Sequence, residues 1–375
     1  MQERLMRYTA LITTVLALVS MAVMLRFASA KTIVIAEEVT AGSGAEQEYA
    51  EKKQESIPLH LVENKAVSPS VCIPLPEDVR PDDIVIENHY IEHRINVIIA
   101  GAETSYYKEK EINGGIGSIR AAACYKESDS VVLAFQMDGL YEHKYLLEEH
   151  ALFLEFVNPH EMYDRIIVLD AGHGGADNGR KEHGLKEKDA SLFIVEQVRN
   201  TFEDSGVRIY CTRQEDASIS AEKRIAFINE LRPDLVISVH LNASEEQSLY
   251  GTEVWYNEQY VIPVFGNVEL ADLLERCVVR AADGRANGLV ACGSRMLQGS
   301  KEATEQKQKQ GKETDVLYTE EEELLMGVRA PAAVLEAGYL TNPRERQLLE
   351  QEAYQKMIAE GICDAIRQWE EQTEE

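Results

Sequence analysis

Two histidines and two glutamates occupy positions where strands are expected to end, and together they could carry out metal-assisted hydrolysis. His173 lies three residues beyond a continuous apolar run, His240 closes a second run and Glu336 closes a third. Glu187 begins an amphipathic stretch that follows the first run. Two neutral imidazoles and one carboxylate form a zinc site that leaves one coordination position for water. A second carboxylate nearby can take the proton of that water.

The surrounding elements are expected to bring these four side chains together. From residue 164 onward, apolar runs alternate with amphipathic stretches, which is typical of a mostly parallel sheet flanked by helices. The carboxyl ends of parallel strands face one crevice, so side chains at those ends share a rim. The expected strands are 165–170, 207–212, 235–240, 251–256 and 332–336, and the expected helices are 187–204, 220–231, 267–282 and 344–371. The sequence therefore predicts an α/β domain over 164–371.

A polar segment interrupts this alternation. Residues 299–324 are rich in Lys, Gln and Glu and lie between two of the sheet-forming runs. Because this composition offers little apolar surface to bury, we interpret the segment as a solvated insertion, either mobile or a polar helix.

The beginning of the chain predicts export. An uncharged, apolar stretch lies between Arg7 and Arg26 and is long enough for a membrane-spanning helix. Behind it, residues 28–30 (ASA) form an acceptable signal-peptidase site. Residues 1–30 are therefore either an uncleaved membrane anchor or a signal peptide. Both interpretations place the rest of the chain outside the cytoplasm.

Two further regions separate this leader from the α/β domain. Residues 31–56 are mostly polar after the first few positions, and we expect a flexible linker there. From 57 to 160, short strand-like runs alternate with turn sequences such as Asn113-Gly114. This pattern predicts a small β-rich domain, which carries no cluster of catalytic residue types.

Composition excludes some functions. The formal charge is −27, with 38 basic and 65 acidic residues, so the chain repels nucleic-acid phosphates and nucleic-acid binding is not expected. The six cysteines include no CxxC pair. Their scatter argues against both a thiolate zinc site and a disulfide-dense scaffold.

Five segments of the C-terminal half resemble, in order, the motifs of the zinc-dependent N-acetylmuramoyl-L-alanine amidases of the amidase-3 family. They are IIVLDAGHGGADNG, GLKEKDASL, YCTRQED, LVISVHLNAS and PAAVLEAGYLTNPRE, within residues 166–369. The resemblance implies a single α/β domain that hydrolyses the amide between N-acetylmuramic acid and the first L-alanine of the peptidoglycan stem peptide.

The resemblance also implies roles for individual residues. In that family the matching residues of His173, Glu187 and His240 bind zinc, and the residue matching Glu336 is the general base. The ion would lower the pKa of its bound water and polarise the scissile carbonyl. Asn242 is a candidate to hold the substrate, with a local strand-end hydrogen bond as the alternative. Some relatives cover the active site with a helix before the last glutamate, so residues 320–323 are a candidate lid.

Two other functions stay open at this point. The same metal chemistry would serve a zinc peptidase that cuts within the stem peptide, and a wall-binding or regulatory protein could keep the fold without turnover. The expected partner is peptidoglycan in each case, with membrane contact only through the N-terminal segment and any activator protein unidentified. The β-rich domain at 57–160 is either a wall- or septum-targeting module or a spacer.

Overall fold

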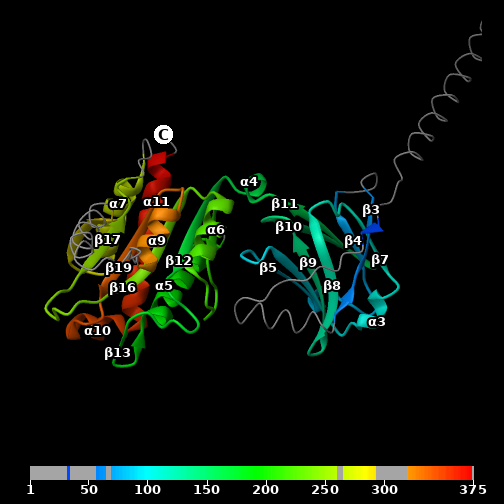
Figure 1. Ribbon diagram of the computed structural model, residues 1–375, viewed down its shortest axis with the longest axis horizontal. Coiled ribbons are helices and arrows are strands. Elements are labelled where there is room, and N and C mark those ends of the chain that lie inside the picture. Colours follow the sequence, from blue (N-terminus) through cyan, green and yellow to red (C-terminus); the bar gives the residue numbers. More distant parts are fainter. Residues whose placement is uncertain are drawn as a thin grey trace, which may run out of the picture. The chain divides into compact units, whose positions relative to one another are not determined.

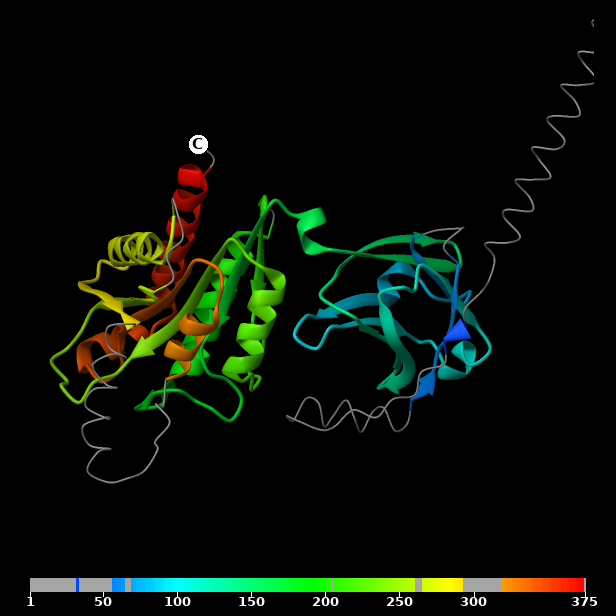
Figure 2. The ribbon, with the colours of Figure 1, turned by 45° about the horizontal axis from the view of Figure 1, so that its top comes forward.

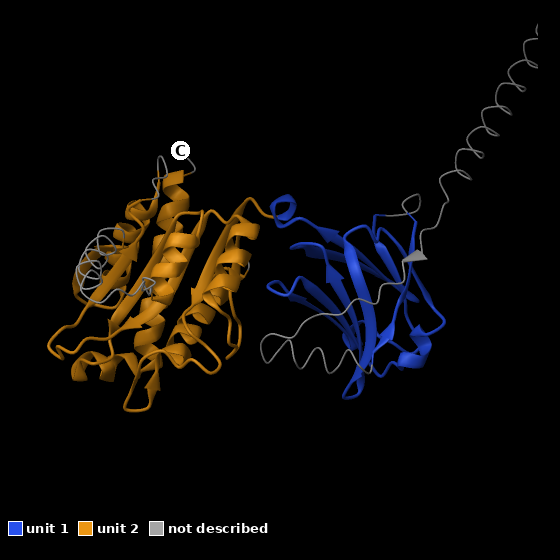
Figure 3. Ribbon diagram, in the orientation of Figure 1, with its two compact units in different colours: residues 1–162 blue, residues 163–375 orange. Residues whose placement is uncertain are grey.

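The computed structural model (Figure 1, and Figure 2 in a turned view) describes residues 32–33, 56–64, 69–203, 205–259, 265–292 and 319–373. The predicted leader at 1–30 and most of the linker at 31–56 and of the insertion at 299–324 lie outside these residues. The chain divides into two compact units, residues 1–162 and 163–375 (Figure 3). In the part of the chain that is described, no helix is long and apolar enough to cross a membrane.

The first unit is built from two β-sheets that share one core. One sheet has the order β1-β3-β7-β4-β11-β10 and the other β2-β8-β9-β6-β5. The strands are β1 Thr32–Ile33, β2 Ile57–Pro58, β3 His60–Glu63, β4 Val71–Pro74, β5 Ile84–His89, β6 Arg94–Ala100, β7 Glu111–Gly114, β8 Ile119–Glu127, β9 Ser130–Met137, β10 Glu142–Glu148 and β11 Ala151–Val157. The short helices are η1 Pro81–Asp83, α3 Thr104–Tyr107 and α4 Pro159–Met162.

The period-two pattern of the sequence explains this packing. In β4, Val71 and Ile73 are buried while the residues between and after them are partly exposed. Alternation of this kind places one face of a strand on the core. Ile73 from the first sheet and Val97 and Phe135 from the second belong to the same buried cluster, so the two sheets pack face to face.

The second unit contains a six-stranded sheet with the order β15-β12-β16-β19-β17-β18. Neighbouring strands are parallel except β17 and β19, which pair antiparallel. The strands are β12 Arg165–Ala171, β15 Val207–Cys211, β16 Leu235–Asn242, β17 Thr252–Tyr256, β18 Ala286–Ala291 and β19 Ala332–Tyr339, with a small hairpin of β13 Lys181–Glu182 and β14 Leu185–Lys186. The helices are α5 Glu187–Thr201, α6 Ala221–Leu231, α7 Asn267–Ala281, α9 Glu320–Gly327, α10 Pro343–Leu349 and α11 Glu352–Thr373.

Helices cover this sheet in two groups. Ile194 of α5, Leu274 of α7 and Ile362 of α11 join one face of the sheet in a single buried cluster. Helices α6 and α9 contact each other, and their buried side chains, such as Phe227 and Leu325, lie outside that cluster. The central strands β12, β16 and β19 are almost entirely buried, as expected for strands covered on both faces. The expected α/β class is confirmed for this unit.

The C-terminal helix expected over 344–371 is instead two helices, α10 and α11. Asn342 caps the start of α10 with its side-chain oxygen. At the other end, the buried Gln355 side chain donates a 2.7 Å hydrogen bond to the carbonyl of Leu349. A helix can end at a buried position when a side chain satisfies its last carbonyl groups. The spacing of apolar residues in the sequence does not show the break between α10 and α11.

Strand β18 and the antiparallel β17–β19 pair were not predicted. The apolar run in β18 is short and follows Gly288, whose φ of +103° lies in the region that favours glycine. Strand β17 runs opposite to β16, and the residues between the two strands, all of which the structure describes, contain no crossover helix, which a parallel connection usually requires. Strand periodicity carries no information on direction.

Candidate metal centre

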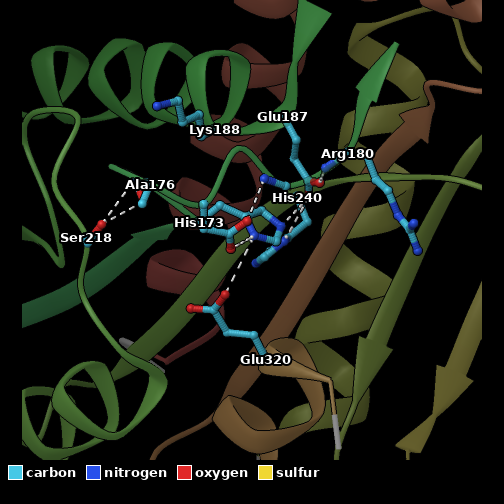
Figure 4. Close-up of polar contacts among 12 residues, drawn as sticks. His173, Ala176, Arg180, Glu187, Lys188, Ser218, His240 and Glu320 are labelled. Carbon is cyan, nitrogen blue, oxygen red and sulfur yellow. Dashed lines mark hydrogen bonds and ion pairs between the residues drawn. The ribbon is translucent and has the colours of Figure 1, made fainter.

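Three of the four residues expected to share one rim of the sheet, His173, Glu187 and His240, meet at one point in the second unit (Figure 4). Glu187 Oε1 lies 3.1 Å from His173 Nε2 and 3.0 Å from His240 Nδ1. Glu336 lies beside His240 on the neighbouring strand, because β16 and β19 pair these two residues in register. The rim expected from the strand order therefore collects side chains from the β12 loop, α5, β16 and β19.

The two histidines are held in different ways. His240 lies near the carboxyl end of β16 and is buried. His173 lies in the loop after β12 at a φ of +59°, in the left-handed region that residues other than glycine seldom adopt. This loop conformation turns the His173 ring back over the end of the sheet, where it forms a T-shaped pair with the His240 ring, with 5.0 Å between centroids.

Glu187 is positioned by backbone donors as well as by the histidines. It is the first residue of α5, and its side chain is buried. Its Oε1 accepts a 3.1 Å hydrogen bond from the Leu241 amide, and its Oε2 accepts a 2.7 Å bond from the Arg180 amide. These bonds leave the carboxylate one orientation, with Oε1 between the two imidazoles.

Two glycines leave room for this arrangement. A side chain at Gly172 would run into the imidazole of His240. A side chain at Gly179 would run into the His173 ring and the Glu187 carboxylate, and this residue also has a φ of +60°. The glycines around His173 are therefore required by close approach of the backbone to the proposed ligands.

The charges of the three residues are strongly linked. Burial alone would raise the pKa of Glu187, but hydrogen bonds from His173 and His240 outweigh it and hold that pKa far below its usual value. Burial alone would lower the pKa of His240, but the Glu187 carboxylate raises it to about 10. A buried carboxylate that attracts cations this strongly is suited to a metal ion.

The spacing fits a small tetrahedral ion. With bonds of about 2.0–2.1 Å, the ligand atoms around zinc are separated by roughly 3.3 Å. The two separations from Glu187 Oε1, 3.0 and 3.1 Å, are close to that value. A fourth donor atom, Glu321 Oε1, lies 3.3 Å from His240 Nδ1 and 3.9 Å from His173 Nε2. The donor set of two imidazoles and carboxylate oxygens therefore matches zinc.

Glu336 differs from His173, Glu187 and His240 because it does not belong to this cluster of donor atoms. It is buried, and among the residues that the structure describes its Oε2 has no hydrogen-bond partner. Burial raises the pKa of Glu336 to about 8, with His240 lowering it and Glu187 among the carboxylates that raise it further. An unpartnered carboxylate oxygen of this basicity is suited to exchange a proton with a molecule in the site.

Sequence reasoning missed Asp177. Its Oδ2 lies 2.6 Å from His173 Nδ1, on the side of the ring opposite Glu187. A carboxylate on the second nitrogen of a metal-binding histidine sets the ring orientation and its tautomer. The only signal in the sequence was an acidic residue four positions after His173. A loop has no regular period, so the direction of the Asp177 side chain could not be predicted.

Asn242 lies at the end of β16, and its side chain makes the local contact given as the alternative. Its Oδ1 accepts a 2.8 Å hydrogen bond from the Ala243 amide. A role in holding the substrate stays a prediction.

The second unit is similar to known N-acetylmuramoyl-L-alanine amidases. A family model described as N-acetylmuramoyl-L-alanine amidase matches residues 167–368. The germination-specific N-acetylmuramoyl-L-alanine amidase of Bacillus subtilis (strain 168) is 27% identical over 216 residues, which cover 54% of this chain and 78% of the relative. A probable cell wall amidase, LytH of Staphylococcus aureus, is 25% identical over 207 residues, covering 54% and 57%. The solved N-acetylmuramoyl-L-alanine amidase from Clostridium difficile 630 is 26% identical, covering 55% and 97%, with a TM-score of 0.45.

Proposed function

The chain belongs to the N-acetylmuramoyl-L-alanine amidase family, and on this premise we propose that it hydrolyses the amide between N-acetylmuramic acid and L-alanine in peptidoglycan. We propose further that His173, Glu187 and His240 hold a zinc ion for this reaction. The observation that carries the proposal is the position of Glu187 Oε1, within 3.1 Å of one nitrogen of each histidine.

Each residue then has a distinct task. Zinc, when bound, supplies a Lewis acid that makes a water more acidic and polarises the scissile carbonyl. Glu336 accepts the proton of the attacking water on its unpartnered oxygen and passes it to the departing amine nitrogen. A cation beside Glu336 would lower its pKa from about 8 toward neutrality, which is the range where one group can both accept and return a proton.

The test is digestion of purified peptidoglycan by the full chain, with and without added zinc, followed by mass spectrometry of the products. We expect zinc-dependent release of stem peptides that begin with a free L-alanine amino group. Cuts inside the stem peptide would instead identify a zinc peptidase. Binding without any product would identify a non-catalytic wall protein.

The same proposal places the enzyme outside the cytoplasm, at its peptidoglycan substrate. The relative from Staphylococcus aureus is described as a probable cell wall amidase. Membrane contact through residues 1–30 and wall targeting by the domain at 57–160 stay predictions.

Helix α9 is proposed to restrict access to the metal centre. Its first turn carries the acidic stretch 320–323, and two of those residues face the histidines: Glu321 Oε1 lies 3.3 Å from His240 Nδ1, and Glu320 Oε2 lies 3.6 Å from His173 Nδ1. Thr319 caps the helix, while Leu324 is buried beneath it. Glu321 would therefore occupy the coordination position that a water needs for hydrolysis.

We expect Glu321→Ala to raise the rate of peptidoglycan hydrolysis at saturating zinc severalfold, because the carboxylate that competes with water is removed. Initial rates of amino-group release measure this. The matched control is Glu323→Ala, which removes an exposed carboxylate from the same turn and should leave the rate unchanged. If Glu321→Ala hydrolyses peptidoglycan no faster than the unmodified chain, α9 does not restrict access to the metal centre.

A further inference from the structure

The loop that carries His173 needs support from outside itself. His173 has a φ of +59°, and the next two residues, Gly174 and Gly175, also have positive φ values. A strained backbone persists only where its surroundings hold it in place. The surroundings here are the residues at and just after the end of β15, where the YCTRQED motif (210–216) lies. That motif has no role in the proposed reaction.

Arg213 connects the two parts of the chain that supply ligands. Its guanidinium is buried and donates a 2.9 Å hydrogen bond from Nε to the carbonyl of Ala171 and a 2.8 Å bond to that of Gly172. The same side chain donates a 2.8 Å bond to the carbonyl of Lys188, the residue after Glu187. One rigid group therefore spans the His173 loop and the first turn of α5.

A second buried arginine, Arg224, also holds the loop. This arginine of α6 is fully buried and donates a 2.6 Å hydrogen bond to the carbonyl of His173 itself and a 2.8 Å bond to that of Ala171. It also forms ion pairs with the buried Asp170 at 2.6 Å and with Glu320 of α9 at 3.2 Å, and these two carboxylates balance its charge. Asp170 in turn accepts a 2.6 Å bond from Ser238 on β16, the strand of His240.

The outer half of the loop is attached to the same segment (Figure 4). Ser218 accepts a 3.0 Å hydrogen bond from the Ala176 amide. Lys188 donates a 2.7 Å bond to the carbonyl of Gly175 and a 2.6 Å bond to Asp216. The residues from 212 to 224 thus hold the first part of the loop, from Gly172 to Ala176.

A neutral donor could satisfy any one of these carbonyls, so the use of two buried guanidinium groups needs a reason. Burying a cation is costly unless its geometry is well matched by partners. The planar guanidinium offers five donors in fixed directions and can hold several carbonyls at set distances, which a flexible lysine cannot do. Among the residues that the structure describes, the hydrogen bonds of Arg213 go to carbonyl and hydroxyl oxygens rather than to carboxylates.

We propose that Arg213 and Arg224 are positioning residues of the metal centre. They set the separation and orientation of His173 and Glu187, and so they determine how tightly the site binds zinc. This inference rests on the proposed zinc site, and it adds a role for a segment that supplies no ligand.

The test is Arg213→Lys in the full chain, with zinc affinity measured by competition against a chromophoric chelator. Arg213→Lys keeps the charge but loses the fork of donors. We expect its zinc affinity to fall about 10–100-fold, as when the outer partners of metal ligands are removed. The matched control is Arg208→Lys on β15, whose guanidinium lies over the rings of Tyr163 and Tyr210, and its zinc affinity should be unchanged.

Melting temperatures of the metal-free proteins separate positioning from stability. A lower melting temperature for Arg213→Lys with unchanged zinc affinity would overturn the inference. If Arg213→Lys does not fold, Ser218→Ala supplies the milder test, since it removes only the two hydrogen bonds that one hydroxyl makes to the loop, with the Ala176 amide and the Gly174 carbonyl. Unchanged affinity there would also count against the inference. Failure of the unmodified chain to bind zinc would overturn the proposed zinc site instead.

Discussion

Glu336→Gln is expected to keep its zinc and to lose turnover by at least about 100-fold, since general acid–base groups contribute roughly 10²–10⁴ to rates. Glutamine has nearly the same shape as glutamate but cannot accept the proton of the attacking water. None of the three proposed zinc ligands is changed in this variant, so the zinc site should be intact. Zinc content by elemental analysis and kcat on purified peptidoglycan fragments measure the two effects separately.

The stability of the metal-free variant provides an independent control. Burial raises the pKa of Glu336 to about 8 in the folded protein, from an ordinary value of 4.5. The protonated Glu336 carboxyl therefore contributes to the free energy of unfolding in full below about pH 4.5, and this contribution is lost as the pH rises through about 8. Metal-free Glu336→Gln, which cannot ionise, should melt at a higher temperature than the unmodified chain at pH 8–9 and show no such advantage near pH 4.5.

A Glu336→Gln variant that melts as expected and still turns over at the normal rate would show that another group is the base. Loss of zinc from this variant, equal to the loss in a ligand variant, would show that Glu336 binds the ion.

Glu187→Ala is expected to lose zinc. The Glu187 carboxylate is the group that lies between the two histidines, with Oε1 at 3.1 and 3.0 Å from their nitrogens. Its removal should weaken zinc binding by more than the roughly 10–100-fold that follows loss of an outer partner of a metal ligand. Activity at limiting zinc should fall with it. Titration against a competing chelator measures the affinity.

The control for this variant is Glu196→Ala, which removes a partly exposed carboxylate from the same helix α5. Its zinc affinity should match that of the unmodified chain. If Glu187→Ala binds zinc as tightly as this control, the three-ligand site is wrong. If Glu187→Ala and Glu336→Gln lose zinc equally, the division of roles between a ligand and a base is wrong.

The elements that carry the site could be predicted because their signals are local. The buried runs that became β12, β16 and β19 are continuous and apolar, and the apolar stripe of α5 repeats at the helical period. His173, His240 and Glu336 could be located relative to those runs by counting along the chain. The convergence of their side chains then followed from the shared edge of a parallel sheet.

The contacts that orient the ligands could not be predicted in the same way. Asp177 reaches the far side of His173 through a loop, and Arg213 reaches the carbonyl of Gly172 across 41 residues of sequence. Glu321 of α9 approaches His240 of β16, which lies far from it in the sequence. None of these contacts is marked by apolar periodicity, because polar side chains in loops and first turns follow no period.

The sequence by itself determined the α/β class of the second unit, the strand ends and the four residues expected at one edge of its sheet, since burial of apolar surface selects strands and helices from neighbouring residues. Only the tertiary structure decided which nitrogen faces Glu187, that a second carboxylate holds His173, and that two buried arginines grip its loop. Those features depend on backbone directions within loops and on distances between segments remote in sequence, and both are set when the whole unit packs.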